Sequence, residues 1–311
     1  MLSQVTEVMD LLDSPGVTGY AVADILRGRG IEDVHVKTLK GARGQTDLVR
    51  ARITGTDGKW RGRDAPTLGI LGRLGGVGAR PEMIGLVSDA DGAVTALAAA
   101  LKLADMKRRG DRLAGDVVVC THVCPDAPVT PHEPVPFMGS PVTVAELNRE
   151  EVSAGDMDAV LSVDTTKGNR IAKWRGFAIT PTVKEGWVLR VSDDLLTVAE
   201  IVTGRPARVV PITTQDITPY GNGLWHINSI MQPATATDVP VVGVAITAES
   251  VVPGCATGAS QPTDIEEAAR FCVEVAKEYG RGRCRFLDED EWKLITRRYG
   301  ALKLLQSPGN P

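Results

Sequence analysis

The stretch that decides the fold runs from Gly85 to Asp126 and reads GLVSDADGAVTALAAALKLADMKRRGDRLAGDVVVCTHVCPD. Apolar residues at three- and four-residue spacing after Gly92 predict an amphipathic helix, and Gly110 ends it. The continuous apolar run VVVC at 117–120 predicts a strand that is covered on both faces. Because open α/β sheets carry their sites beyond the carboxyl ends of their strands, we expect a site in the THVCPD segment that follows.

Helical and strand patterns alternate along the rest of the chain. We expect helices over 3–13, 19–29, 144–152, 193–204 and 262–280, a helix start within 224–231, and strands over 33–38, 46–54, 67–71, 158–164, 207–213 and 239–247. This alternation predicts a three-layer α-β-α fold with a mostly parallel central sheet. We expect one domain over residues 1–311, with a proline-rich loop at 125–142 and an extra C-terminal helix at about 286–306.

The composition narrows the class of protein. The 311 residues are 43% hydrophobic and carry a net charge of -4, which gives no electrostatic reason to expect nucleic acid or an anionic membrane as partner. No apolar run approaches the roughly 20 residues of a membrane-spanning helix, and the N-terminus lacks the pattern of a signal peptide. We therefore expect a soluble cytoplasmic protein, and the sequence leaves a homo-oligomer open.

The cysteines argue against both a disulfide framework and a structural zinc site. There are five, an odd number that does not suit a secreted disulfide scaffold. Cys120 and Cys124 lie close together, but no second closely spaced Cys or His pair completes a zinc pattern. We expect most of these side chains to be buried thiols that pack as small hydrophobic groups.

Acidic residues stand at two places where an α/β fold builds its sites. Asp89 and Asp91 precede the long helix, and Asp164 ends the apolar segment DAVLSVD. Buried acids at strand ends tend to cluster at functional sites, so Asp89 and Asp164 are candidate site residues and Asp91 is a weaker one. The alternative for Asp89 and Asp91 is a turn and a helix cap.

The segment after the strand at 117–120 is rich in possible ligands. His122, Cys124 and Asp126 lie at the strand end, and His132 and Glu133 follow in the proline-rich loop. Imidazole and thiolate suit zinc, whereas a carboxylate-rich site suits magnesium or manganese. Cys124 as a nucleophile would need a base near it in space. The alternative is that His122 packs beside the strand and that CPDAP is a tight turn.

Six segments follow one another in an order that suggests a family: LLDSPGVTGY, SDADGAVTALAAALKLA, DAVLSVDTT, RGFAITP, DVPVVGVAI and PTDIEEAARFCVEVAKEY. Over about residues 5–275 they resemble the glutamyl-aminopeptidase or tetrahedral-aminopeptidase type of zinc exopeptidase. The resemblance implies a zinc-exopeptidase (phosphorylase/hydrolase)-like fold. The GRLGG and CPDAP segments also resemble a bacterial and archaeal family of unknown function.

The resemblance also implies a metal site, but in an altered form. Asp89 stands where the relatives have a metal-bridging aspartate, and Asp164 where they have another metal-binding aspartate. The other positions have changed: the first histidine and its paired aspartate fall at Arg73 and Gly75, the two glutamates near Cys124 and Pro125, and the last histidine near Val252, with Cys255 the nearest possible ligand. His122 would then be the added metal ligand. Asp126 is chemically a better general base than Cys124.

Two further departures bear on assembly and on ligand binding. The relatives' dimerisation domain lies where this chain has only GGVGARPEMIGLVS, so their dodecameric assembly is not expected. The guanidinium of Arg73 would repel a metal ion. It is therefore a candidate either for a salt bridge with Asp89 or for clamping a substrate carboxylate or phosphate.

These observations support two hypotheses. The first is an atypical hydrolase of amide bonds in small peptides or amino-acid derivatives. It would use one divalent metal, zinc or manganese, held by Asp89, Asp164 and His122, with Asp126 or Cys124 in the catalytic role. The second is an inactive relative, without a metal, that binds a peptide or a small carboxylate through Arg73. The replaced ligands favour the second hypothesis, and the ligand-rich loop favours the first.

Overall fold

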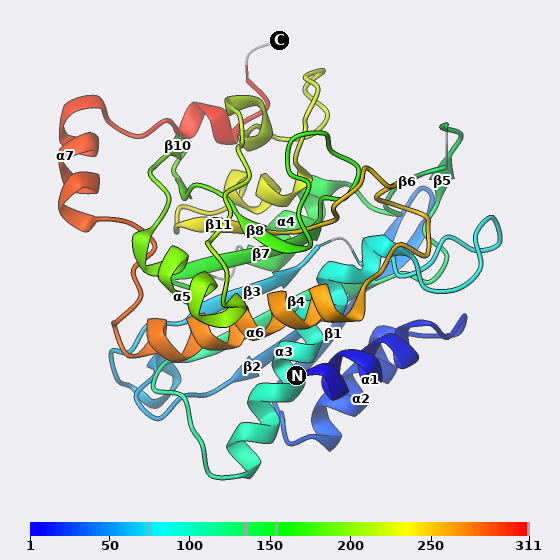
Figure 1. The fold of residues 1–311 in the computed structure, drawn as a ribbon, viewed down its shortest axis with the longest axis horizontal. Coiled ribbons are helices and arrows are strands. Elements are labelled where there is room, and N and C mark those ends of the chain that lie inside the picture. Colours follow the sequence, from blue (N-terminus) through cyan, green and yellow to red (C-terminus); the bar gives the residue numbers. More distant parts are fainter. Residues whose placement is uncertain (74, 134–135, 153–154, 310–311) are drawn as a thin grey trace.

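In the computed structural model, a large mixed sheet lies between two layers of helices (Figure 1). The structure describes residues 1–73, 75–133, 136–152 and 155–309. The strands of the sheet are β1 (Val34–Gly41), β2 (Gly44–Ile53), β3 (Leu68–Gly72), β4 (Val117–Val123), β7 (Ala159–Thr165), β8 (Gly176–Ile179), β9 (Val183–Lys184), β10 (Trp187–Val188) and β11 (Val241–Thr247). They run in the order β1-β2-β4-β3-β7-β11-β9-β10, and β8 also pairs with β11.

The centre of this sheet is parallel and its flanks are antiparallel. β4, β3, β7 and β11 pair in parallel, and they are buried along almost their whole length. Such strands read as continuous apolar runs because helices cover both of their faces. The β1–β2 hairpin at one edge is antiparallel and half-exposed. The expected three-layer fold around a mostly parallel sheet is confirmed in these central strands.

One face of the sheet carries most of the helices (Figure 1). They are α1 (Leu2–Leu12), α2 (Gly19–Gly28), α3 (Asp91–Arg108), α5 (Asp193–Thr203) and α6 (Pro262–Gly280). The sequence predicts α3 to be amphipathic, but it is buried on nearly all sides because α1 and α6 pack against it. Its many buried alanines let these neighbours approach closely, since each carries only a methyl group.

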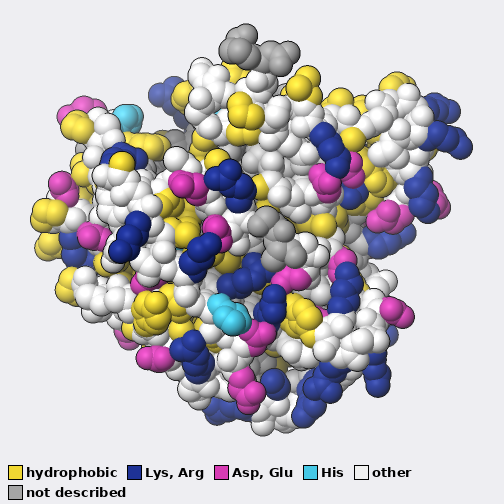
Figure 2. Space-filling view, turned by 180° about the vertical axis from the view of Figure 1, so that it is seen from behind, with side chains coloured by type: hydrophobic (Ala, Val, Ile, Leu, Met, Phe, Trp, Pro, Cys, Tyr) yellow, Lys and Arg dark blue, Asp and Glu magenta, His cyan; other side chains and the backbone are white. Residues whose placement is uncertain are grey.

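The other face carries a thinner layer made of α4 (Val144–Val152) and the 3-10 turns η3 (Thr214–Ile217) and η4 (Ser229–Thr235). A second core lies beneath them, which includes Leu71, Val118, Val160, Ile230 and Met231. Figure 2 looks onto the molecule from behind, and in this view acidic and basic side chains alternate without either sign forming one patch.

Three expectations need correction in detail. Residues 207–213 form no regular strand and contribute only a bridge between Val209 and Ile179. Pro206 and Pro211 flank this bridge, and proline removes the backbone donors that a ladder needs. The predicted helix start in 224–231 is instead the 3-10 turn η4. The proline-rich loop holds the short strands β5 (Val129–Thr130) and β6 (Phe137–Met138), while its residues 134–135 lie outside the described part.

The C-terminal segment lies on the outside of the molecule. It holds α7 (Glu289–Tyr299) and the turn η5 (Lys303–Gln306), close to the expected 286–306 (Figure 1). Trp292 is the one buried residue of α7, and Lys184 lies over its ring at 5.3 Å. In the described part of the chain, no helix has the length and apolar character that crossing a bilayer requires.

Candidate functional site

Three backbone segments meet at the carboxyl ends of the parallel strands. The amide of Arg73, just after β3, donates to the carbonyl of Val163 in β7 at 2.7 Å. Gly92, at the start of α3, packs against both, because a Cβ there would lie 2.0 Å from the Arg73 oxygen and 2.4 Å from the Val163 oxygen. Only glycine fits this contact. The contact brings the side chains of residues 73, 89, 91 and 164 to one edge of the sheet.

Asp89 is the least satisfied acid at this edge. It lies in the turn η2 (Ser88–Ala90), and its exposed fraction is 7%. No hydrogen bond to its carboxylate is found among the described residues. Burial raises the pKa of Asp89 well above its usual value; Asp164 and Asp91 raise it further, and Lys167 opposes them. Such a carboxylate gains free energy by taking up a proton or by meeting a cation.

Asp164, at the end of β7, is fixed on both oxygens. The hydroxyl of Ser229 donates to Oδ2 at 2.8 Å, and the amide of Thr165 donates to Oδ1 at 2.8 Å. Burial raises the pKa of Asp164 to about 6, although the Ser229 hydrogen bond and the nearby guanidinium of Arg73 lower it. Asp164 is therefore held in one orientation close to Asp89.

Asp91 pairs with a lysine that the sequence patterns do not single out. The ammonium of Lys167 and the carboxylate of Asp91 form an ion pair in which neither side chain is exposed. Lys167 Nζ also donates to the carbonyl of Ala259 at 2.6 Å, and the Ser260 hydroxyl donates to Asp91 Oδ1 at 2.6 Å. The sequence feature that could have indicated Lys167 is its place three positions after the strand-end acid Asp164, in DTTK.

Arg73 forms a second buried ion pair, with Glu151 of α4 rather than with Asp89. Its Nη1 donates to Glu151 Oε2, and neither side chain is exposed. The Nε and Nη2 groups of Arg73 and the Oε1 atom of Glu151 are buried without a partner among the described residues. Sequence patterns missed Glu151 because NREEV looks like the solvated face of a helix.

His122 has both ring nitrogens engaged. The amide of Gly75 donates to Nε2 at 2.9 Å, so Nδ1 carries the proton and donates to the Thr46 hydroxyl at 2.9 Å. Thr46 in turn donates to the carbonyl of Val123 at 3.1 Å. Burial, helped by Arg73, lowers the pKa of His122 to about 3. The ring is thus neutral, and a metal ion could bind Nε2 only by displacing the Gly75 amide.

The other residues proposed from the loop do not join the acids. Cys124 is buried, with its thiol 3.5 Å from the Asp126 carboxylate, and burial raises its pKa to about 12, so it stays protonated. Asp126, His132 and Glu133 are exposed. In the described part of the chain, no hydrogen bond connects any of these four side chains with Asp89 or Asp164. Of the proposed site residues, Arg73, Asp89 and Asp164 come together; His122 is close enough to Arg73 for that charge to lower its pKa, but both of its ring nitrogens are bound elsewhere.

The donor set does not fit the two-metal centre that the resemblance implies. Over residues 1–73, 75–133, 136–152 and 155–309, no three His, Cys, Asp or Glu side chains are arranged to hold a metal ion. Two side-chain cations, Arg73 and Lys167, are buried next to the acids instead. A positive charge already fixed at such a position repels an incoming metal ion.

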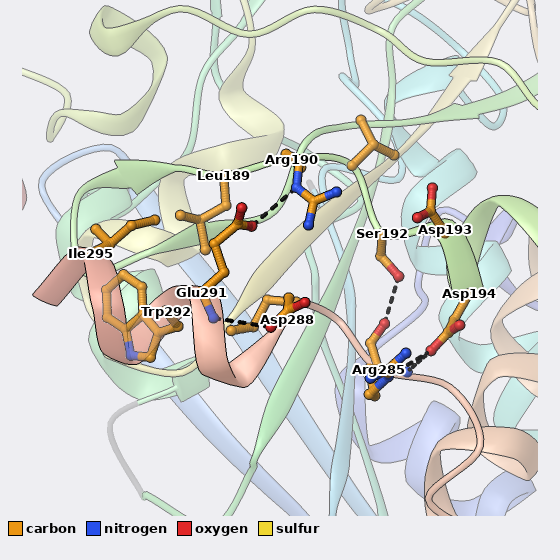
Figure 3. Close-up of a pocket in the computed structure, with 12 residues that line it drawn as sticks. Leu189, Arg190, Ser192, Asp193, Asp194, Arg285, Asp288, Glu291, Trp292 and Ile295 are labelled. Atoms are coloured by element: carbon orange, nitrogen blue, oxygen red, sulfur yellow. Dashed lines mark hydrogen bonds and ion pairs between the residues drawn. The ribbon is translucent and has the colours of Figure 1, made fainter.

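A hollow of about 90 Å³ lies between residues 189–194 and α7, away from these acids in the sequence (Figure 3). Its charged side chains pair with one another: Arg190 with Glu291 at 3.0 Å and Arg285 with Asp194 at 3.3 Å. The Asp288 carboxylate accepts hydrogen bonds from two amides of the first turn of α7. These contacts fasten the C-terminal segment to the body of the protein, and we assign the hollow a structural role.

The comparison with protein families places the chain. A family model described as a protein of unknown function, DUF1177, matches residues 37–309. The chain belongs to the DUF1177 family. This agrees with the expected resemblance to a family of unknown function. No curated protein sequence matches this DUF1177 chain.

Solved structures extend the comparison to the fold of this DUF1177 chain. A mutant of tomato leucine aminopeptidase is 12% identical with a TM-score of 0.50, over 88% of this chain and 61% of that one. The LapA aminopeptidase of Legionella pneumophila is 12% identical with a TM-score of 0.49, over 92% and 70%. A glutaminyl cyclase from an Acidobacteriales bacterium is 11% identical with a TM-score of 0.49, over 90% and 94%. At these identities the similarity concerns the aminopeptidase-like fold alone.

Proposed function

We propose that the chain binds the amino group of a small peptide or amino-acid derivative, and that Asp89 receives the ammonium. The observation that carries the proposal is the Asp89 carboxylate itself, which is 7% exposed and has no hydrogen bond among the described residues. A buried acid without a partner is costly unless a cation or a proton meets it. Its position beyond the ends of parallel strands is where α/β folds bind ligands.

The small exposure of the acids limits what can reach them. Asp89 and Asp164 are 7% and 3% exposed, so only a small group of the ligand, such as its ammonium, would reach them. The rest of the ligand would lie outside. Asp164 and the Lys167–Asp91 pair would position Asp89. Because Arg73 is buried and paired with Glu151, we assign it the role of holding the charge of Asp164 rather than that of clamping a ligand carboxylate.

Amide hydrolysis is the second candidate function, and the raised pKa of Asp89 favours it. A carboxyl group whose pKa lies nearer to neutrality can exchange protons with water and with a leaving amine. In this role Asp89 would take a proton from the attacking water and return it to the departing nitrogen. This candidate uses the same ammonium contact, so the two functions differ only in turnover.

Calorimetric titration with a set of dipeptides and with their N-acetylated forms tests the proposal. Free amino termini should bind and acetylated ones should not, because acetylation removes the positive charge. Asp89→Asn should abolish the binding, whereas the matched control Asp126→Asn, at an exposed acid, should leave it unchanged. Equal binding of acetylated peptides, or retained binding by Asp89→Asn, would contradict the proposal.

Mass spectrometry of the same mixtures tests for turnover. Dipeptides and amino-acid amides, with N-acetylated dipeptides as the control, are incubated with the protein, once with a chelator and once with added zinc or manganese. Products that appear with wild type and not with Asp89→Asn support the hydrolase candidate. Binding without products identifies the chain as a binding protein.

A further inference from the structure

Lys167 occupies an unusual place for a lysine. It lies just beyond the end of β7 with an exposed fraction of 1%, and lysine is almost never buried unless it is paired. Its ammonium donates to two oxygen-bearing groups, the Asp91 carboxylate and the Ala259 carbonyl, and the Ser260 hydroxyl donates to the other Asp91 oxygen. The charge therefore sits inside a set of oxygen ligands.

The same set of oxygens would suit a hard divalent cation. Carboxylate, carbonyl and hydroxyl oxygens are the ligands that magnesium and manganese prefer. Asp91 also lies near other acids. Beside burial, the charge of Asp264 raises the pKa of Asp91, and the charge of Asp91 raises the pKa of Asp89. Buried acids at this density need a positive charge among them. In this chain the positive charge comes from a side chain.

We propose that Lys167 is a built-in cation that takes the place of a divalent metal ion among Asp91, Ala259 and Ser260. The native protein then needs no metal ion at this position and excludes one by charge repulsion. The proposal does not depend on whether a peptide binds at Asp89. It explains how the Asp91 carboxylate can be fully buried beside Asp89 and Asp264 in this chain.

Removal of the lysine charge should create a metal site. In Lys167→Met, which keeps an unbranched side chain up to the Cε position and removes only the ammonium beyond it, Mn²⁺ should bind at least about tenfold more tightly than in wild type, because a like charge at contact distance costs more than that factor. Calorimetry and the electron paramagnetic resonance signal of free Mn²⁺ measure the affinity. Adding Asp91→Asn to Lys167→Met should remove the new site.

Two controls isolate the effect of this lysine. Lys167→Arg keeps the charge and should remain without Mn²⁺ binding. Lys293→Met removes an exposed lysine paired with Asp290 at 3.1 Å, and it should behave like wild type. Folding of each variant is checked by circular dichroism. Stoichiometric Mn²⁺ or Mg²⁺ binding by wild type, or a folded Lys167→Met that binds no better than wild type, would overturn the proposal.

The experiment stays decisive if Lys167→Met does not fold alone. The variant is then refolded from urea with Mn²⁺ and, in parallel, with a chelator. Refolding that requires Mn²⁺ supports the proposal, because the metal ion then replaces the missing ammonium. Failure to refold in both conditions counts against it.

Discussion

Arg73 and Glu151 form an ion pair in which neither side chain is exposed to solvent. Arg73 lowers the pKa of Asp164, and the other buried cation, Lys167, lowers that of Asp89. Each cation is paired with another acid, Arg73 with Glu151 and Lys167 with Asp91, and so only partly offsets the charge of Asp164 or Asp89. The electrostatics of the site are set by side chains that cannot leave, unlike a metal ion.

Removing one partner of the buried Arg73–Glu151 pair should strongly lower the stability of the fold. Glu151→Gln leaves a buried guanidinium without its counter-charge, and we expect the free energy of unfolding to fall by about 3–5 kcal/mol. Urea denaturation measures the change. The neighbouring Glu150→Gln is a matched control, because Glu150 forms a half-exposed pair with Lys37 and should cost at most about 1 kcal/mol. Equal effects of the two variants would show that the buried pair has no special role.

The raised pKa of Asp164 predicts a pH dependence with a definite sign. The folded state keeps the proton up to a pKa of about 6, whereas the unfolded chain releases it near 3.8. The contribution of Asp164 is thus complete below pH 3.8 and is lost as the pH rises through 6. Relative to Asp164→Asn, wild type should lose about 2 kcal/mol between pH 4 and pH 7. Urea denaturation at several pH values measures this, with Asp126→Asn as the control; a constant difference would refute it.

The lowered pKa of His122 predicts that its contribution to stability falls as the pH is lowered, opposite to that of Asp164. Its folded-state pKa of about 3 lies below the ordinary 6.5, so the unfolded chain takes up a proton first as the pH falls. Its contribution is complete above pH 6.5 and is lost progressively toward pH 3, by up to about 5 kcal/mol. Nitrogen-15 NMR should show one neutral imidazole with its proton on Nδ1 down to about pH 4. Loss of that signal in His122→Gln assigns it, and titration near pH 6.5 would contradict the buried hydrogen-bond chain.

The sequence predicted the layers of the fold better than the chemistry of the site. Apolar runs such as 117–120 and 158–164 locate the parallel strands because burial on both faces leaves a direct trace in composition. The prediction of a strand at 207–213 was wrong because Pro206 and Pro211 limit the pairing of this apolar run with β8 to a single bridge. Backbone pairing is decided by partners distant in sequence, which periodicity does not reveal.

At the site, the sequence located the strand-end acids but not the two buried ion-pair partners, Glu151 and Lys167. Asp89 and Asp164 are found by position, since strand ends and helix starts are visible in the chain. Glu151 and Lys167 are not, because charged residues in helices and turns are ordinarily solvated, and only the structure shows that these two are buried. His122 and Cys124 look like ligands in sequence, yet their hydrogen bonds to residues 75, 46 and 45 show what they contact instead.

Cys124 should be unreactive in the folded protein. Burial raises its pKa to about 12, so almost no thiolate is present at neutral pH, and the thiolate is the form that reacts. We expect iodoacetamide at pH 7.5 to modify the half-exposed Cys255 first and to reach Cys124 only after unfolding in urea. Peptide mapping by mass spectrometry follows each site. Cys124→Ser should leave ligand binding and any turnover unchanged. Rapid alkylation of Cys124 in the native protein, or loss of activity in Cys124→Ser, would restore it as a nucleophile.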